Sequence, residues 1–349
     1  MNKETTPANR YQELDALRGI AALLVVLFHF ALCADKYDSV LILGTTGIDL
    51  FFMISGFVIF MSMEKITSAK QFITNRFSRL YPTYWTAVSF TFVLLILEYI
   101  FKRSTHQPDV VKYLANMTMF QYYFEIPDID GPYWTMIIEM LFYIVILLLY
   151  QLRGLKYAIH IFTVLSVLTA ILCNYFYDNV FVKELMHWFP LLPHLPLFLA
   201  GMIFYKIYSS QTKLIYHYTL LLICLLCGLA LFKHAGRSNY YVSLAQYQII
   251  LPVFFMLFVL FVHGKLTFIV NGVTLFFGKI SYPLYLTHQH ISIMLILPVF
   301  MKDYGMNFWI AALLIDLPVV ICIAAFITYG IEIPFHKKLK KQFSQIQKV

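Results

Sequence analysis

Residues 17–34 read LRGIAALLVVLFHFALCA, a run in which Arg18 carries the only full charge. A helix needs about 20 mainly apolar residues to cross the hydrocarbon core of a bilayer, and this run approaches that length. Similar runs follow along the whole chain, near residues 46–63, 84–101, 132–151, 156–174, 190–208, 214–233, 246–263, 273–299 and 307–330. The sequence therefore predicts an all-α, polytopic bundle of about ten membrane-spanning helices.

The composition supports a membrane protein. The 349 residues are 60% hydrophobic and 13% charged, whereas a soluble chain carries about 25% charged residues. A water-soluble enzyme, a secreted disulfide scaffold and a disordered chain are thereby excluded. The net charge of +8 is typical of anchoring charge on cytoplasmic loops, so we expect the lipid bilayer and no nucleic acid as a partner.

The distribution of Lys and Arg predicts the orientation. With a cytoplasmic N-terminus, 18 of these residues fall on the inner side and 8 on the outer side. This bias and the even number of spans predict that both termini are cytoplasmic. No signal peptide precedes the first span. We expect one membrane domain over residues 1–349, with a core at 10–335 and a basic cytoplasmic tail at 336–349.

The cysteines and common nucleotide motifs narrow the chemistry further. All five cysteines lie in apolar runs, and Cys224 and Cys227 form a CxxC pair without a second pair or a histidine. Buried thiols are therefore expected, and a metal site is not. The chain has no G-x-G-x-x-G, P-loop or G-x-S-x-G motif, which excludes the usual nucleotide-binding and hydrolase signatures.

Polar groups inside the predicted spans are the strongest functional signal, because an ionisable side chain in a bilayer is costly unless it faces the bundle interior. The groups in question are Asp15, Arg18, His29, Asp49, Glu139, His194, His288, His290 and Asp316. Arg18 and His29 are eleven residues apart, so a helix places them on one face with about 16 Å of rise between them. Asp15 shares that face. An interfacial ion pair with a separate core histidine would give the same spacing.

Four further segments carry candidate groups. Arg76 and Arg79 would be neighbours on a helix and could bind a phosphate, or they could anchor the chain at the membrane surface. Glu139 lies inside the span that Gly131-Pro-Tyr-Trp134 opens, where it needs a partner. Ser55 and Gly56 favour close helix packing. Ser281-Tyr-Pro283 is expected to break the ninth span, with His288 nearby.

Taken in order, these segments resemble the membrane acyltransferase 3 family, which O-acylates bacterial surface sugars. The matching stretches are Leu14-Asp15-Ala-Leu-Arg18-Gly19…His29, Gly47-Ile-Asp49-Leu-Phe-Phe-Met-Ile-Ser55-Gly56, Arg76-Phe-Ser-Arg79, Trp134-Thr-Met-Ile-Ile-Glu139 and Ser281-Tyr-Pro-Leu-Tyr285-Leu-Thr-His288. Two departures stand out: Thr135-Met136 replaces the usual Ser-Leu, and Asn75 stands where the family often has a basic residue.

The resemblance implies an acyl-CoA-dependent O-acetyltransferase with His29 as general base and Glu139 as the second catalytic residue, orienting His29 or holding the acceptor. Acetyl-CoA would be the donor, and no metal is expected. Arg18, Arg76 and Arg79 would bind its phosphates. The predicted substrate-binding residues are Asp15, Trp134, Tyr285 and His288, with Asp15 also fixing Arg18.

The implied setting is the bacterial cytoplasmic (inner) membrane, with a sugar of an exopolysaccharide, an O-antigen or another surface glycan or glycolipid as acceptor. Acetyl or succinyl transfer, direct transfer or a covalent acyl-enzyme, and a monomer or a homo-oligomer all remain open. The alternative function is a proton-coupled transporter or flippase of a lipid-linked sugar, with His29, Glu139 and His288 as the proton path.

Overall fold

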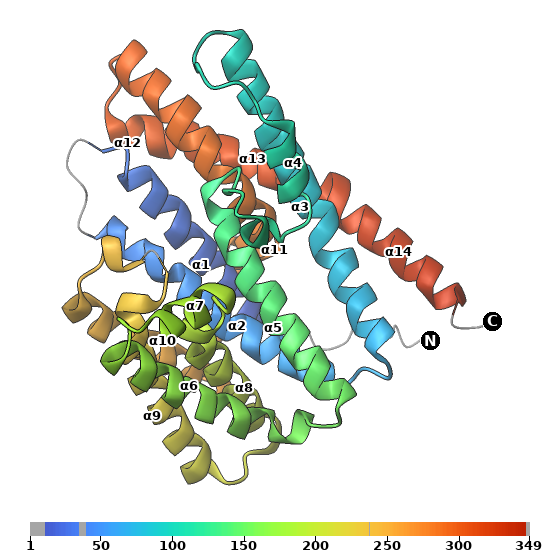
Figure 1. The fold of residues 1–349 in the computed structure, drawn as a ribbon. Coiled ribbons are helices and arrows are strands. Elements are labelled where there is room, and N and C mark those ends of the chain that lie inside the picture. The colour runs from blue at the N-terminus through green and yellow to red at the C-terminus, as the bar shows by residue number, and fades with distance from the viewer. Residues whose placement is uncertain (1–10, 35–39, 237, 347–349) are drawn as a thin grey trace.

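A computed structural model describes residues 11–34, 40–236 and 238–346. Within these ranges the chain is helical and forms no β-strand (Figure 1). Nine helical segments of this described part are long and apolar enough to cross a membrane, and a pair bent by 77° adds a tenth. The predicted all-α polytopic bundle is therefore confirmed.

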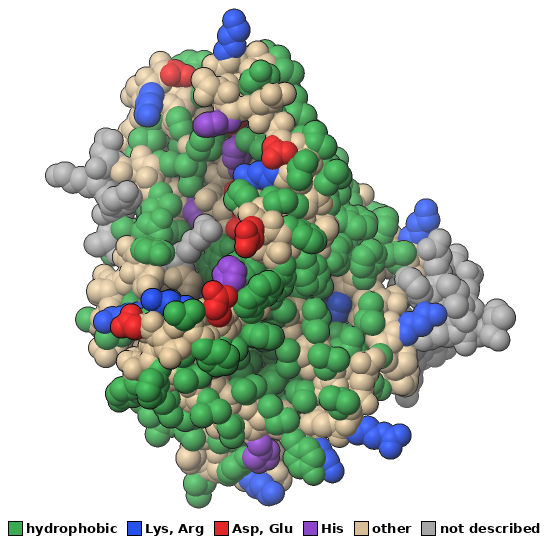
Figure 2. Space-filling model, viewed as in Figure 1, with side chains coloured by type: hydrophobic (Ala, Val, Ile, Leu, Met, Phe, Trp, Pro, Cys, Tyr) green, Lys and Arg blue, Asp and Glu red, His purple; other side chains and the backbone are tan. Residues whose placement is uncertain are grey.

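The principal helices follow the predicted runs closely. They are α1 (Gln12–Ala31), α2 (Gly47–Met63), α3 (Ala69–Ile100), α4 (Val110–Asn116), α5 (Trp134–Gln151), α6 (Ala158–Tyr175), α7 (Val180–Trp188), α8 (Leu195–Ser210), α9 (Leu214–Leu231), α10 (Leu244–Val262), α11 (Gly272–His290), α12 (Phe308–Ile310), α13 (Leu317–Ile327) and α14 (Ile333–Ile346). Figure 2 shows a face covered largely by hydrophobic side chains, with most Lys and Arg toward its margins, as a lipid-facing surface requires.

The sixth span lies where it is predicted, because the run near 190–208 corresponds to Leu192–Ser210. A further helix, α7, precedes it and meets it at a bend of 77°. Pro190 lies two residues after the end of α7 and cannot extend it, since proline lacks the N–H that an interior helical position donates. Pro196 then lies in the first turn of α8, where that missing donor costs nothing.

The predicted break in the ninth span is wrong. α11 continues through Pro283 to His290. Hydroxyl groups next to the proline bond the helix backbone: Ser281 Oγ donates to the Gly278 carbonyl at 2.9 Å and Thr287 Oγ1 to the Pro283 carbonyl at 2.9 Å. A proline inside a membrane helix therefore does not have to end it, since neighbouring helices can support the freed backbone group.

The third span begins earlier than predicted. α3 is continuous from Ala69, where the Ser68 hydroxyl caps it by accepting a hydrogen bond from the Gln71 N–H at 3.2 Å. Arg76 and Arg79 therefore belong to the membrane helix itself, on its second and third turns, and not to a loop before it. Their side chains can enter the bundle.

Glycine contacts set the two closest helix pairs. A Cβ on Gly278 of α11 would lie 2.1 Å from the Asp15 carbonyl oxygen of α1, and one on Gly201 of α8 would lie 2.0 Å from the Met53 carbonyl oxygen of α2. Small residues let membrane helices approach to backbone contact in this way. The predicted packing role of Gly56 is confirmed, because its Cβ would lie 2.0 Å from the Phe198 carbonyl oxygen.

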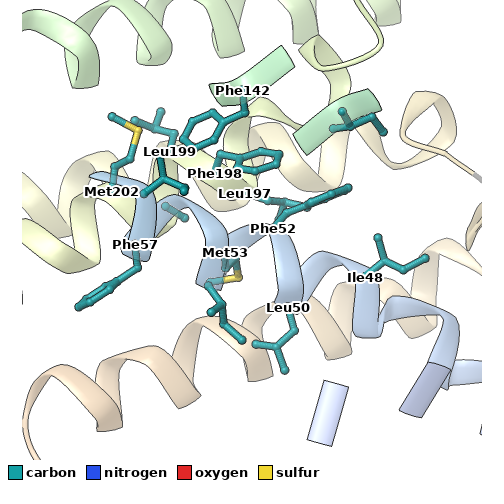
Figure 3. Packing of buried hydrophobic residues seen from close by; sticks show 14 of the residues in the cluster. Ile48, Leu50, Phe52, Met53, Phe57, Phe142, Leu197, Phe198, Leu199 and Met202 are labelled. Carbon is teal, nitrogen blue, oxygen red and sulfur yellow. The ribbon is translucent and has the colours of Figure 1, made fainter. Parts of the chain in front are cut away.

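The core beside α2 is built from large apolar side chains (Figure 3). Phe198 of α8 stacks on Phe52 of α2 at a ring-centroid distance of 4.8 Å and on Phe142 of α5 at 4.3 Å. This aromatic stack ties three helices together. Because α2 is thereby fixed against both α5 and α8, its opposite face is held toward α1 and α11.

The start of the first span and the end of the last span lie on the same side of the bundle. One groove is lined by Gln12 at the start of α1, Gly272 at the start of α11 and Tyr329 near the end of the last span. An even number of spans requires this arrangement. The assignment of that side to the cytoplasm stays a prediction.

Candidate active site

A cavity of about 130 Å³ lies between α1, α2, α3, α5 and α11. Its wall is apolar on one side, where Phe51, Phe52 and Met136 contribute. The polar lining residues are Arg18, Ser55, Arg76, Arg79, Thr135, Glu139, Tyr143, Lys279, Ser281, Tyr282, Tyr285 and Glu332. The structure thus brings the three predicted cofactor-binding arginines together in one pocket.

Two of these arginines are held by groups around them. Arg18 Nη1 lies 3.6 Å from Asp15 Oδ1 one helical turn earlier, as predicted. The Arg76 guanidinium lies over the rings of Phe72 and Tyr143, with its central carbon 5.6 and 5.9 Å from the ring centroids. Aromatic faces hold a cation while leaving N–H groups to donate. The buried Arg76 Nε–H has no hydrogen-bond acceptor among the described residues.

Glu139 lies in the arginine pocket and not against His29. Its Oε1 accepts a hydrogen bond from Ser55 Oγ at 2.8 Å and a second one from the Tyr143 hydroxyl. The two roles predicted for Glu139, orienting His29 or holding the acceptor, stay predictions. Ser55 also does more than the expected close helix packing, since its hydroxyl donates a hydrogen bond to the Glu139 carboxylate.

Sequence reasoning missed two charged residues of the pocket, Lys279 and Glu332. Lys279 was counted only as an inner-side charge, and its Nζ lies 4.3 Å from the centroid of the Tyr329 ring. Glu332 lay just beyond the predicted end of the tenth span. Its signal was a carboxylate next to an apolar run, and ending that run at residue 330 hid it.

His29 pairs with His288 in the other half of the bundle core. His29 Nδ1 lies 2.9 Å from His288 Nε2 and 2.9 Å from the Val25 carbonyl oxygen. His288 Nδ1 lies 2.9 Å from the Leu284 carbonyl oxygen and 3.0 Å from that of Tyr285. His288 is fully buried and His29 is 8% exposed. The contact between the two rings does not follow from the spacing within one helix.

Tyr285 joins the arginine pocket to the histidine pair. It lines the pocket, and its hydroxyl bonds Thr135 Oγ1 at 3.0 Å and the Pro132 carbonyl at 3.1 Å. Its ring centroid lies 6.3 Å from that of His288. Tyr285 therefore lies between the pocket, which neither histidine lines, and the His29–His288 pair.

Comparison with known proteins identifies the family of this chain. A family model described as an acyltransferase domain, Acyl_transf_3, matches residues 11–334, which is nearly the whole chain. The chain belongs to the acyltransferase 3 family. This membrane acyltransferase is also similar to a putative acetyltransferase, ORF330, of Acidianus two-tailed virus, with 23% identity over 298 residues that cover 82% of this chain and 85% of the viral protein. No solved structure gives a significant match.

Trp134 of the acyltransferase lies near the bend of the sixth span. Its ring centroid is 5.8 Å from that of His194, and a Cβ on Gly236 would lie 2.6 Å from the Trp134 ring. The loop that carries Gly236 continues to Tyr241, whose ring centroid lies 4.9 Å from that of Phe28, next to His29. This loop links the surroundings of Trp134 to those of His29.

A second polar cluster lies beyond the histidine pair in the acyltransferase. His290 Nε2 lies 2.9 Å from Glu98 Oε1, and the His290 backbone N–H donates to Asp130 Oδ2 at 3.4 Å. Asp130 also caps the turn that begins at Gly131, accepting from its N–H at 2.7 Å. Burial raises the pKa of the Asp130 carboxyl to about 6.

Two further acids are buried within the bundle of the acyltransferase, Asp49 and Asp316. Asp316 Oδ1 accepts a hydrogen bond from Ser292 Oγ at 3.0 Å, whereas Asp49 Oδ2 has no hydrogen-bond partner among the described residues. In the part of the chain that the structure describes, no three His, Cys, Asp or Glu side chains gather in a metal-binding arrangement.

Proposed function

We propose that this membrane acyltransferase lies in the bacterial inner membrane and moves an acyl group, most simply acetyl, from cytoplasmic acyl-CoA to a hydroxyl of a cell-surface glycan. The observation that carries the proposal is the position of an arginine-lined pocket and a basic histidine at opposite ends of one helix face. Arg18 and His29 are eleven residues apart on α1, or about 16 Å of helical rise.

The arginine pocket supports a phosphate-bearing donor. Arg18, Arg76 and Arg79 line it with Lys279, while Glu139 and Glu332 supply the negative charge. Guanidinium groups bind phosphates through paired N–H donors, and Arg76 Nε–H is one donor without an acceptor in the described residues. A proton-coupled carrier has no need of such a pocket.

The distance along α1 suits coenzyme A. With the phosphates at the arginines, an extended pantetheine arm would run past Tyr285 and bring the thioester near His29. The apolar wall of Phe51, Phe52 and Met136 matches an uncharged arm better than a sugar phosphate. The acceptor would approach from the opposite side, where Trp134 could offer a flat face to a sugar ring.

The chemistry follows from that placement. His29 takes the proton of the acceptor hydroxyl, and the oxygen attacks the thioester carbonyl carbon as a new C–O bond forms. The C–S bond then breaks, and the thiolate that leaves takes the proton from the His29 imidazolium. An imidazole can take up a proton and release it again near neutral pH, which suits both transfers.

The test is a thiol-release assay on the purified protein in detergent. Acetyl-CoA is supplied alone and with a panel of bacterial surface-glycan extracts, for the wild type and for His29→Ala. We expect acceptor-dependent release of free coenzyme A that the variant loses. Absence of release with every extract, together with absence of acetyl-CoA binding, would contradict the proposal and favour the transporter of a lipid-linked sugar.

A further inference from the structure

The hydrogen bonds around His29 and His288 determine which ring nitrogens carry protons. A carbonyl oxygen only accepts hydrogen bonds, so His288 Nδ1, at 2.9 Å from the Leu284 oxygen, carries a hydrogen. For the same reason His29 Nδ1, at 2.9 Å from the Val25 oxygen, carries one. When both rings are neutral, Nε2 of each ring then holds the lone pair.

This arrangement makes the contact between the two rings directional. The single hydrogen on His29 Nδ1 is shared between the Val25 oxygen and His288 Nε2, each 2.9 Å away. The His288 ring is anchored in turn by its own helix. The opposite tautomer of either histidine would place a lone pair against a carbonyl oxygen in a buried site. That clash costs as much as an unmade hydrogen bond of a buried polar group.

We propose that His288 is a positioning residue that fixes the tautomer of His29 and stabilises the imidazolium formed during acyl transfer. The inference rests on the proposed function, in which His29 is the general base. His29 Nε2 receives the hydroxyl proton, and the charged ring then donates from Nδ1 to His288 Nε2. A hydrogen bond from a charged donor is stronger than one from a neutral donor, so the transition state gains more than the ground state does.

The proposal changes the role predicted for His288 from substrate binding to support of His29. His288 is fully buried, and both of its ring nitrogens are within 3.0 Å of protein partners. In a glutamine, the end of the side chain lies where Nε2 of a histidine lies, whereas in an asparagine it reaches only the Nδ1 position. These two residues form a matched pair, because both are neutral amides and only glutamine can accept from His29 Nδ1–H.

The experiment compares His288→Gln, His288→Asn and His288→Leu with the wild type, using acetyl-CoA and the glycan extract that supports release. We expect kcat to fall about 10- to 100-fold in the Asn and Leu variants, the range that a hydrogen bond to a charged group is worth. The Gln variant should recover at least half of that loss on a logarithmic scale. The KM for acetyl-CoA should stay within about twofold, because His288 is not in the arginine pocket.

Equal kcat values for Gln and Asn, or a change confined to KM, would overturn the proposal. If the wild type transfers acetyl groups and His29→Ala does not, such a result refutes the role of His288 and leaves the proposed function intact. If the wild type itself shows no transfer, the proposed function has failed instead.

A second measurement does not require the His288 variants to fold. In ¹⁵N-histidine NMR of the wild type, the signal absent from His29→Ala belongs to His29. We expect a hydrogen on Nδ1 and a lone pair on Nε2. A hydrogen on Nε2 of the neutral ring would overturn the proposal.

Discussion

The arginine pocket and the histidine pair occupy opposite parts of the same two helices, α1 and α11, and they are built by different means. The pocket gathers charged side chains from four helices, α1, α3, α5 and α11, and from the end of the last span around one cavity. The pair consists of two imidazole rings held by backbone carbonyls and by each other. The first region is suited to hold a charged ligand, and the second is suited to move one proton.

The comparison predicts the largest effect for loss of the base itself. His29→Ala should lower kcat about 100- to 10,000-fold, the usual contribution of a general base. Binding of acetyl-CoA, measured by calorimetry, should be unchanged, because Arg18 and its partners remain. Retention of more than a tenth of wild-type kcat would remove His29 from the mechanism.

For the second polar cluster, formed by His290, Glu98 and Asp130, we expect the free energy of unfolding to depend on pH. The pKa of the Asp130 carboxyl is raised from about 4 to about 6, so folding favours its protonated form. The stabilisation is present below pH 4 and is lost as the pH rises through 6, by up to about 3 kcal/mol. Asp130→Asn keeps the capping oxygen without titrating.

Thermal unfolding in detergent at pH 4.5 and pH 8 checks this prediction. The wild type should lose more Tm over that interval than Asp130→Asn does. Equal changes in the two proteins would show that Asp130 titrates normally.

For the pocket, we expect a binding defect and not a chemical one. Arg76→Ala should raise the KM for acetyl-CoA about 10- to 100-fold with a smaller change in kcat, since a charged hydrogen-bond donor to phosphate is lost. Lys70→Ala is the matched control, because Lys70 is an exposed cation on the same helix. A similar effect of both substitutions would mean that Arg76 acts through general surface charge.

The smallest expected effect concerns the support of Glu139. Ser55→Ala removes one of the two hydroxyl donors to this carboxylate and leaves Tyr143 in place. The KM for acetyl-CoA should rise about 3- to 10-fold, as for one hydrogen bond. Ser62→Ala on the same helix is the control, since the Ser62 hydroxyl bonds the Ile59 carbonyl. A loss of kcat in Ser55→Ala would instead place Ser55 at the reacting atoms.

Relations within one helix could be predicted from the sequence. The spans follow from apolar length, and the helical period places Asp15, Arg18 and His29 on one face. The Asp15–Arg18 contact at 3.6 Å confirms the first part of that face. These predictions succeed because α-helical geometry is the same in every helix.

Relations between helices could not be predicted in the same way. Nothing in the spacing says that Glu139 meets Ser55, or that His288 meets His29, since these contacts depend on how helices dock. The docking depends on backbone contacts such as the one at Gly278. The continuity of α11 through Pro283 was also hidden, because a proline inside a membrane helix does not have to end it.

The central claim is that one donor molecule spans the two regions. The most direct measurement is a cryo-electron microscopy structure of the protein with a non-hydrolysable thioether analogue of acetyl-CoA. The account predicts that the phosphates lie against Arg18, Arg76 and Arg79. It also predicts that the acyl end lies next to the position of an acceptor hydroxyl that is hydrogen-bonded to His29 Nε2. Phosphates bound elsewhere, or an acyl end that stops beside Glu139, would contradict it.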